Sequence, residues 1–151
     1  MKAVIALGAN LEDPEQAVEI ALALLAQAGE VLSASSLYKT KPVGGPEQGD
    51  YFNAVALMES DLPPHELLHL LQGIEKSMGR VRSERWGPRI IDLDLITYAD
   101  FIVGSAELTL PHPRAHERRF VLEPWMEIDP EASIPGLGPI ATILAKLPAA
   151  E

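Results

Sequence analysis

The pattern of apolar and polar positions near the N-terminus predicts a buried strand followed by a helix. The run at 2–7 is apolar after its lysine and stops before a glycine, as in a buried strand. Asp13, Pro14 and Gln16 then supply an N-cap, a proline at the first helical position and a capping-box partner. Apolar side chains recur at helical spacing after them, and Gly29 is the expected end of this helix.

The middle of the chain predicts three further strands, a long loop and a second helix. Residues 31–38 and 51–58 alternate between apolar and polar, as strands with one buried face do. Between them, 40–50 is rich in proline and glycine and is therefore expected to be a loop of the length that is often functional. Leucines at helical spacing predict a helix over 64–79, and a strand is expected over 90–98.

The C-terminal part predicts short strands around 101–103 and 108–110, then helices over 114–127 and 138–147. The order β-α-β-β-α-β favours an α+β fold of the ferredoxin-like βαββαβ type, with helices on the faces of an antiparallel sheet and a helical C-terminal extension. A four-stranded sheet with both main helices on one face is expected. Without an internal linker or repeat, residues 1–151 are expected to form one domain.

Composition excludes several classes of protein. The chain has no cysteine, which excludes a disulfide framework and thiolate chemistry. No apolar run reaches the length of a membrane span, and the N-terminus lacks a convincing signal peptide, so we expect a soluble, cytoplasmic protein without membrane contact. The net charge of −10 argues against a general nucleic-acid binder.

The positive charge is distributed unevenly. All seven arginines lie within 80–119 beside six acidic residues, whereas the remainder carries five lysines and sixteen acidic residues. An acidic protein that concentrates its arginines in one segment is expected to bind a compact anion there. A solvated, salt-bridged surface is the alternative interpretation.

An aspartate pair follows four of these arginines. Asp92 and Asp94 alternate along a predicted strand, so both side chains point to one face while Leu93 points to the other. Such a pair could hold one Mg²⁺, or two that share ligands. Arginine supplies planar donor forks that suit phosphate oxygens, so the segment combines the groups that phosphoryl transfer requires. The four arginines are Arg80, Arg82, Arg85 and Arg89.

A second motif indicates a different enzyme class. His65 and His69 match the His-Glu-x-x-His pattern of zinc peptidases and share one face of a predicted helix. A catalytic zinc needs a third protein ligand, for which His112 and His116 are available. The same pattern also arises by chance in amphipathic helices rich in leucine and glutamate. Zinc peptidase chemistry is therefore the second enzyme hypothesis.

Several other residues suit a flat heterocycle or a phosphate. Tyr51 and Asn53 share one strand face and, with Phe120, offer a stacking surface and a paired donor and acceptor. Ordinary strand packing explains these three residues equally well. His112 is held between prolines, and near a phosphate it and Arg118 would donate to anionic oxygens, although a packing role for the histidine is the simpler interpretation.

These motifs together resemble the 6-hydroxymethyl-7,8-dihydropterin pyrophosphokinase family of folate biosynthesis. The segment from Arg85 to Asp94, Arg-Trp-Gly-Pro-Arg-x-x-Asp-Leu-Asp, is highly specific to that family. The resemblance covers nearly the whole chain, and its weaker motifs occur in the right order: 8–11, 40–44, 51–54, Glu75, 111–114 and 117–120.

The resemblance implies transfer of the β,γ-diphosphate of ATP, the co-substrate, to the hydroxymethyl group of the dihydropterin, with release of AMP. It implies two Mg²⁺ ions held by Asp92 and Asp94, with Arg80, Arg82 and Arg89 completing the catalytic set. The implied ATP contacts are Gln72, Glu75, Arg82, Arg85, Trp86, Arg89, Thr109, His112 and Arg118. The implied pterin contacts are Thr40, Pro42, Val43, Tyr51, Asn53 and Phe120.

A non-enzymatic hypothesis also remains open, namely a ferredoxin-like module that binds RNA or senses a ligand. The acidic charge and the lack of an aromatic-rich RNP pattern count against RNA. The sequence sets no protein partner and is compatible with a monomer.

Overall fold

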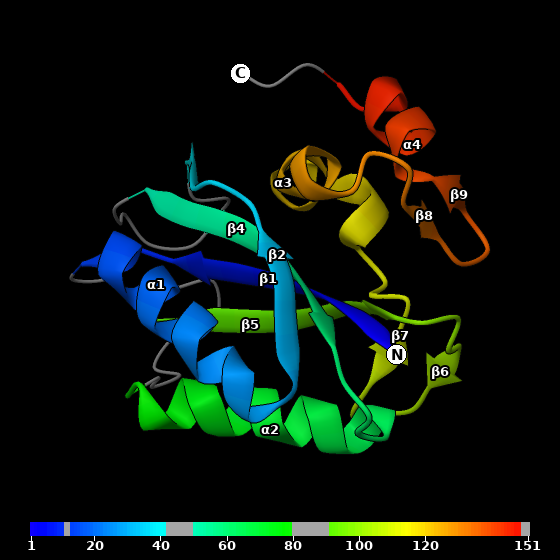
Figure 1. Ribbon diagram of the computed structural model, residues 1–151. Coiled ribbons are helices and arrows are strands. Elements are labelled where there is room, and N and C mark those ends of the chain that lie inside the picture. Colours follow the sequence, from blue (N-terminus) through cyan, green and yellow to red (C-terminus); the bar gives the residue numbers. More distant parts are fainter. Residues whose placement is uncertain (11–12, 42–49, 80–90, 149–151) are drawn as a thin grey trace.

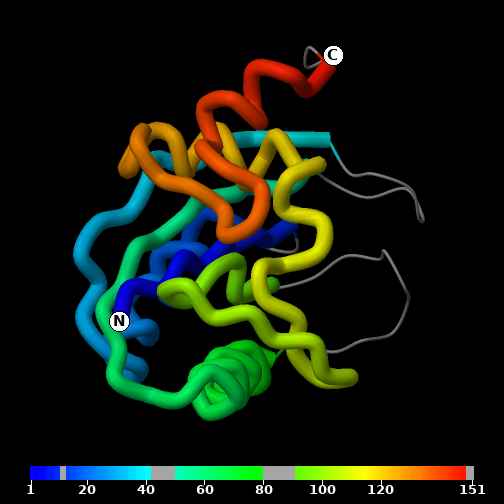
Figure 2. Tube along the Cα trace, turned by 90° about the vertical axis from the view of Figure 1, so that its right-hand side faces the viewer, coloured from blue at the N-terminus to red at the C-terminus, as the bar shows by residue number. Residues whose placement is uncertain are grey.

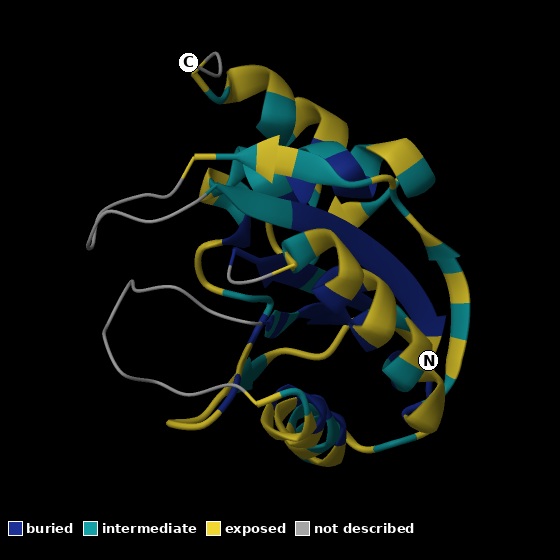
Figure 3. Cartoon of the chain, turned by 90° about the vertical axis from the view of Figure 1, so that its left-hand side faces the viewer, coloured by how far each residue is buried: buried dark blue, intermediate teal, exposed yellow. Residues whose placement is uncertain are grey.

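The computed structural model describes residues 1–10, 13–41, 50–79 and 91–148. It is a mixed α+β structure in which helices cover both faces of an antiparallel sheet (Figure 1). Helix α2 (Pro64–Ser77) and the C-terminal helices lie at opposite ends of the molecule, with the sheet between them (Figures 1 and 2). Buried residues concentrate in the sheet, and exposed residues lie on the outer sides of the helices (Figure 3).

The sheet is built around the central strand β1 (Lys2–Ala9), which pairs with β4 (Tyr51–Glu59) on one side and with β5 (Asp92–Tyr98) on the other. The path of the sheet is β2-β4-β1-β5, where β2 is Glu30–Ala34, and every pairing is antiparallel. A short strand β3 (Tyr38–Thr40) also pairs with β4, so the sheet has five strands rather than the four expected.

The expected single strand over 31–38 is wrong, because the chain makes two strands with a break at Ser35 and Ser36. The Ser35 hydroxyl accepts from the Val55 backbone N–H at 3.0 Å, in place of a backbone carbonyl. The Ser36 N–H donates to the Glu127 carboxylate at 2.8 Å instead of to a strand. Serine side chains compete with ladder hydrogen bonds in this way, and the alternation of apolar residues does not reveal it.

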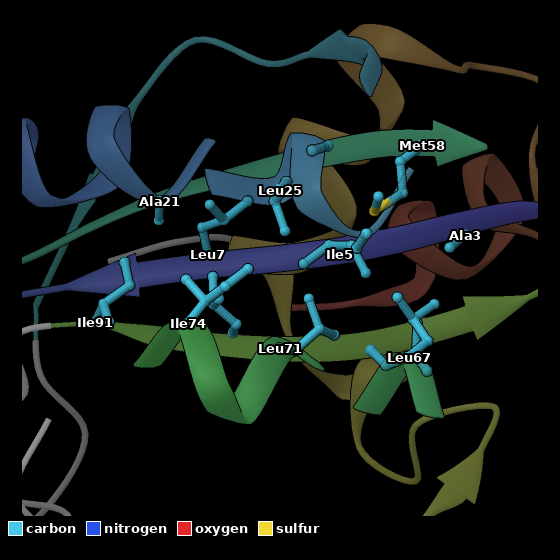
Figure 4. Packing of buried hydrophobic residues seen from close by; sticks show 14 of the residues in the cluster. Ala3, Ile5, Leu7, Ala21, Leu25, Met58, Leu67, Leu71, Ile74 and Ile91 are labelled. Carbon is cyan, nitrogen blue, oxygen red and sulfur yellow. The ribbon is translucent and has the colours of Figure 1, made fainter. Parts of the chain in front are cut away.

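Two helices pack on one face of the sheet, as expected. Helix α1 (Pro14–Leu24) begins at Asp13, whose carboxylate accepts from the Gln16 N–H at 3.2 Å, and helix α2 spans Pro64–Ser77. A 3₁₀ turn (η1, Leu25–Gln27) follows α1. Alternate residues of β1 pack against apolar side chains of both helices in the first core (Figure 4). That core includes Ala3, Ile5, Leu7, Leu25, Leu67, Leu71 and Ile74.

The C-terminal helices α3 (Arg119–Ile128) and α4 (Ile140–Lys146) cover the other face of the sheet. The expected helix over 114–127 is therefore partly wrong, since a 3₁₀ turn (η2, Ala115–Glu117) precedes α3. The second core brings α3 and α4 against the remaining face of the sheet, through Val4, Val55, Leu57, Ile96, Leu122, Trp125 and Ile140.

Two small hairpins complete the fold. Strands β6 (Val103–Gly104) and β7 (Thr109–Leu110) lie close to the two short strands expected from the sequence, and they pair with each other as a hairpin. Strands β8 (Ser133–Ile134) and β9 (Gly138–Pro139) form a hairpin that was not predicted. Its strands are too short for a periodic pattern to be visible.

Candidate active site

Three strands bring chemically active residues side by side at one end of the sheet. Gly8 of β1 lies opposite Asn53 of β4 and opposite Asp92 of β5. These positions belong to the same face as Val4 and Val55, which pack against α3 farther along the strands. Helix α3 thus covers only part of this face. Because Ala6 and Gly8 have small or no side chains, the uncovered part has room for a ligand.

A cavity of about 680 Å³ opens at this end of the sheet. It is large enough for a small-molecule ligand and combines apolar walls with convergent polar groups. The chain over residues 110–120 runs from the level of α2 up to α3 (Figure 2). Several of its side chains, from His112 to Phe120, line the cavity. The cavity is lined by Ala6, Leu7, Gly8, Thr40, Lys41, Tyr51, Asn53, Leu68, Gln72, Glu75, Asp92, Leu93, Asp94, His112, Arg114, Glu117, Arg118, Arg119 and Phe120.

The aspartate pair has the alternation that the sequence predicted. Leu93 and Leu95 are buried in the first core, while Asp92 and Asp94 line the cavity. Glu75 of α2 reaches under the strand, where it accepts a 2.8 Å hydrogen bond from the Leu93 N–H. This hydrogen bond to α2 holds the backbone of β5 between the two aspartates.

Arg118 places a cation beside these carboxylates. Its Nη1 lies 3.8 Å from Asp94 Oδ2, and its guanidinium carbon lies 5.6 Å from the centre of the Phe120 ring. The ring face favours a cation at that distance. Arg118 is thus held between an anionic group and an aromatic surface, in a cavity wall where it can donate to an anionic ligand.

His112 is neutral at physiological pH. Its pKa is lowered to about 4, chiefly by burial and in addition by the positive charges of Arg118 and Arg114. Its Nδ1 accepts from the Arg114 N–H at 3.2 Å. That hydrogen bond leaves Nε2 as the nitrogen that carries the hydrogen, so the ring offers a neutral N–H donor.

The amide of Asn53 is held in one orientation. Its Nδ2 donates to Thr40 Oγ1 at 2.7 Å and to the Tyr38 carbonyl at 3.4 Å. Both donor directions are thus turned toward β3, and Oδ1 remains as the acceptor. A Cβ on Gly8 would lie 3.1 Å from this oxygen. Tyr51 and Phe120 line the same cavity, so the predicted aromatic and amide residues are brought together.

A smaller cavity of about 260 Å³ shares Leu68, Leu93, Asp94 and His112 with the large one. Thr109 lies in this smaller cavity, whereas Gln72 and Glu75 line the large one. The two cavities meet at Asp94 and His112. Asp94 therefore lies where the cavity lined by Gln72 and Glu75 adjoins the cavity lined by Thr109.

Seven predicted site residues lie outside the described residues: Pro42, Val43, Arg80, Arg82, Arg85, Trp86 and Arg89. The cavity also contains charged residues that sequence reasoning did not select, among them Lys41, Arg114, Glu117 and Arg119. All four occur in motifs that carry the family resemblance, but their charges alone could equally mark a solvated surface.

The zinc hypothesis receives no support from the part of the chain that the structure describes. There His65 Nε2 lies 3.1 Å from Ser105 Oγ, and His69 contacts Glu107. No group of three histidine, aspartate or glutamate side chains within the described ranges is arranged to hold a metal. The His-Glu-x-x-His match is thus a pattern on an amphipathic helix that fastens α2 to the β6–β7 hairpin.

Among the described helices, none combines the length and the apolar character that crossing a bilayer demands.

A cavity that joins paired carboxylates and an arginine to an aromatic and amide wall is typical of proteins that hold a polyphosphate beside a flat heterocycle. Residues 4–130 match the profile of the 7,8-dihydro-6-hydroxymethylpterin-pyrophosphokinase (HPPK) family. The chain belongs to this family.

Curated relatives agree with the family match. The 2-amino-4-hydroxy-6-hydroxymethyldihydropteridine pyrophosphokinase of Haemophilus influenzae is 44% identical over 135 residues, which cover 88% of this chain and 84% of the relative. The protein of the same name from Bacillus subtilis is 44% identical over 128 residues, covering 83% of this chain and 77% of the relative.

Solved structures support the fold. A Plasmodium falciparum HPPK-DHPS triple mutant with pteroate aligns over 96% of this chain with a TM-score of 0.78 and 16% identity. An HPPK-DHPS structure in complex with substrates aligns over 95% of this chain with a TM-score of 0.77 and 14% identity. This chain spans 43% of the length of each of these larger chains.

Proposed function

We propose that this protein transfers the β,γ-diphosphate of ATP to the hydroxymethyl group of 6-hydroxymethyl-7,8-dihydropterin and releases AMP, a step of folate biosynthesis. The protein is thereby an ATP-dependent pyrophosphokinase with two small-molecule substrates. The observation that carries the proposal is the convergence of Asp92, Asp94 and Arg118 with Asn53 and Phe120 on one cavity. Asp92, Asp94 and Arg118 suit the polyphosphate of ATP with its metal ions, and Asn53 and Phe120 suit the pterin ring.

The aspartate pair fits Mg²⁺. Magnesium binds to proteins through one or two carboxylates and keeps its other positions for water and substrate phosphates. Asp92 and Asp94 supply two carboxylates on one strand face, and a set of three acidic or histidine ligands does not occur within the described ranges. We propose that they hold two Mg²⁺ ions, which would screen the triphosphate and lower the pKa of the attacking hydroxyl.

The remaining polar residues bind and orient the polyphosphate. Arg118 offers guanidinium hydrogens next to Asp94, and His112 offers a neutral N–H donor from Nε2. Charge builds up on phosphoryl oxygens during transfer, so donors that are already in place stabilise it without reorganisation. Gln72, Glu75 and Thr109 are proposed nucleotide contacts on the sides of the two cavities. By resemblance, Arg80, Arg82, Arg85, Trp86 and Arg89 complete the ATP site.

The pterin is proposed to lie between Tyr51 and Phe120, with Asn53 at its polar edge. Because the Nδ2 of Asn53 donates toward β3, its Oδ1 is the atom that accepts from a ring N–H. Thr40 holds that amide, and Pro42 and Val43 are proposed backbone contacts by resemblance.

The fold is proposed to be of the ferredoxin-like type within a single domain over 1–151. The path β2-β4-β1-β5, with α1 and α2 packed on one face, supports this assignment. In that topology the two helices leave the opposite face free for additional elements, and α3 and α4 occupy part of it here.

The experiment mixes the protein with ATP, Mg²⁺ and 6-hydroxymethyl-7,8-dihydropterin and follows the nucleotide products. AMP formed in equal amount to a diphosphorylated pterin supports the proposal, and a chelator of divalent cations should stop its formation. ADP as the product, or no pterin-dependent product, would contradict it.

The variant Asp94→Asn keeps the size of the side chain and removes its charge. We expect its turnover to fall by about a thousandfold or more, as for the loss of a principal electrostatic group. Asp100→Asn is the matched control, because Asp100 is exposed and follows the end of β5. Wild-type turnover in Asp94→Asn would remove the proposed metal role.

A further inference from the structure

Glu127, near the C-terminal end of α3, joins that helix to the sheet through three hydrogen bonds. Its Oε2 accepts from the Ser36 N–H at 2.8 Å. Its Oε1 accepts from the Ser36 hydroxyl at 2.7 Å and from the Tyr38 hydroxyl at 2.7 Å. Glu127 is the centre of this cluster, which fastens the start of β3 and the break before it to α3.

The helix itself does not account for a carboxylate at this place. The C-terminal end of a helix carries partial negative charge, so an acidic side chain there is disfavoured. The three hydrogen-bond donors around Glu127 offset this unfavourable interaction and stabilise its ionised form. The hydrogen bonds from Ser36, first its hydroxyl and then its backbone N–H, lower the pKa of Glu127, and the one from Tyr38 lowers it further. In turn, the hydrogen bond to Glu127 raises the pKa of Tyr38, so that its hydroxyl remains a donor.

The cluster acts on a short strand at the edge of the sheet. Strand β3 has three residues and, among the strands that the structure describes, pairs only with β4, by Tyr38 opposite Asn53 and Thr40 opposite Tyr51. The register of so short an edge strand is weakly fixed by its own ladder. The hydrogen bonds from Ser36 and Tyr38 to Glu127 of α3 therefore contribute strongly to the position of β3.

Strand β3 in turn fixes the amide of Asn53. The Tyr38 carbonyl and Thr40 Oγ1 are both acceptors for Asn53 Nδ2, at 3.4 and 2.7 Å. A shift of β3 would move both acceptors together and release the amide. Asn53 is 6% exposed, so a released amide would lack partners in a buried place.

We infer that Glu127 is a positioning residue for pterin recognition, which acts through Tyr38 and β3 to hold the Asn53 amide with its oxygen toward the ligand. This inference rests on the proposed function, because it concerns the pterin side of the same cavity. Glu127 itself is exposed and does not line the cavity. Its effect on the reaction is therefore one of geometry and not of contact with the substrate.

The test compares Glu127→Gln and Tyr38→Phe with the wild type under saturating concentrations of the second substrate. Tyr38→Phe removes one hydrogen bond of the cluster, whereas Glu127→Gln replaces one of the two acceptor oxygens and weakens the remaining bonds by removing the charge. We expect KM for the pterin to rise about threefold to tenfold, the range for one lost hydrogen bond, while kcat and KM for ATP stay within about twofold. Glu131→Gln, an exposed glutamate four positions beyond Glu127, is the matched control and should behave as wild type.

A second measurement does not need enzymatic activity. In ¹⁵N spectra, the side-chain amide of Asn53 should shift and exchange its hydrogens faster in Glu127→Gln and in Tyr38→Phe, but not in Glu131→Gln. The double variant should add little to either single change, because both act through one cluster. Thermal unfolding of each variant establishes that it is folded.

The outcomes separate the two proposals. An unchanged Asn53 amide together with an unchanged KM for the pterin would overturn the inference, and so would an equal rise in KM for ATP. If the wild-type protein releases no AMP, the proposed function fails, and the Asn53 amide signal then decides the positioning role of Glu127 by itself.

Discussion

Glu75 and Leu93 are joined by a hydrogen bond of 2.8 Å from the Leu93 N–H to the Glu75 carboxylate. Leu93 separates Asp92 from Asp94, so this bond fixes the strand at the point where both aspartates leave it. Glu75 is 5% exposed, so its carboxyl group lies in a buried place between α2 and β5. Buried carboxylates are retained only where they are hydrogen-bonded, which gives Glu75 a structural effect on the carboxylate pair.

Replacing Glu75 should weaken both folding and turnover. In Glu75→Ala the buried Leu93 N–H loses its acceptor, so we expect a loss of about 1–3 kcal/mol in the free energy of unfolding, measured in urea. Turnover should fall as well, because Asp92 and Asp94 lose their fixed position. Glu75→Gln keeps an acceptor oxygen and should lose less of both. The control Glu66→Ala removes an exposed glutamate of the same helix, and a loss of stability as large as that of Glu75→Ala would refute the argument.

Gly8 is predicted to control access of the pterin to Asn53. A Cβ at this position would lie 3.1 Å from Asn53 Oδ1, and the amide cannot easily move away because Thr40 holds it. We expect Gly8→Ala to raise KM for the pterin by about fivefold or more, with little change in KM for ATP, in steady-state kinetics.

Gly73→Ala is the matched control for Gly8→Ala. Gly73 lies within α2, and a Cβ there would meet no atom within 4 Å. Alanine is the better helix former, so this variant should gain up to about 1 kcal/mol in stability and keep the wild-type KM for the pterin. Equal kinetic effects in the two variants would contradict the role assigned to Gly8.

Gly29 tests the fold without touching the cavity. A Cβ on Gly29 would approach the Glu59 carbonyl oxygen at 2.0 Å, and this oxygen belongs to the backbone of β4. Gly29 leads directly into β2, so neither its backbone nor that of β4 can move without disturbing the sheet, and Gly29→Ala should lower the free energy of unfolding by about 3 kcal/mol. The residual folded protein should show wild-type KM values, so a changed KM for either substrate would argue against this separation of fold and site.

The periodicity of apolar residues correctly predicted the helices and strands that have the clearest buried faces. The apolar run of β1, the amphipathic α2 and the alternation of β5 lie within one or two residues of expectation. In each of them a burial pattern extends over at least two turns or seven residues, so local sequence and tertiary packing favour the same structure. The N-cap at Asp13 was predicted for the same reason, since its hydrogen bond is local.

Long-range side-chain contacts account for what the sequence did not reveal. The break between β2 and β3 depends on Glu127, which lies 91 residues beyond Ser36 in the chain. The cavity wall at Arg119 likewise depends on contacts beyond its own motif, since its guanidinium binds Glu123 and the carbonyl of Pro148. No periodic pattern encodes such pairs, and they become visible only once the layers are assembled.

The candidate site was predictable in its chemistry rather than in its geometry. Asp92, Asp94 and Asn53 were selected because their side chains suit metal and heterocycle recognition, and all three line one cavity. Their proximity follows from the register of β1 with both neighbours, which places Gly8 opposite Asn53 and Asp92 and Ala6 opposite Asp94. Register is fixed by the pairing of whole strands, so a short motif does not predict which residues of neighbouring strands lie opposite each other.

His112 should make the protein less stable in mild acid. Its pKa in the folded protein is about 4, lowered from 6.5 by burial and by the charges of Arg118 and Arg114. As the pH falls below about 6.5, the unfolded chain takes up a proton on this residue while the folded protein does not. The free energy of unfolding should therefore decrease between about pH 6.5 and 4, and above that range His112 should contribute no slope.

Urea unfolding of the ligand-free protein at a series of pH values checks this expectation. The contribution of one proton is at most about 1.4 kcal/mol per pH unit, and it is smaller here because His112 is only partly buried and solvent screens its charge. His112→Asn cannot take up the proton, so its stability should depend less on pH over that window. Arg114→Gln removes one of the two repelling charges and should raise the pKa of His112, which an NMR titration of the ring measures directly. A ring that titrates near 6.5 in the folded wild type would contradict the burial argument, and with it the assignment of His112 as a neutral donor at neutral pH.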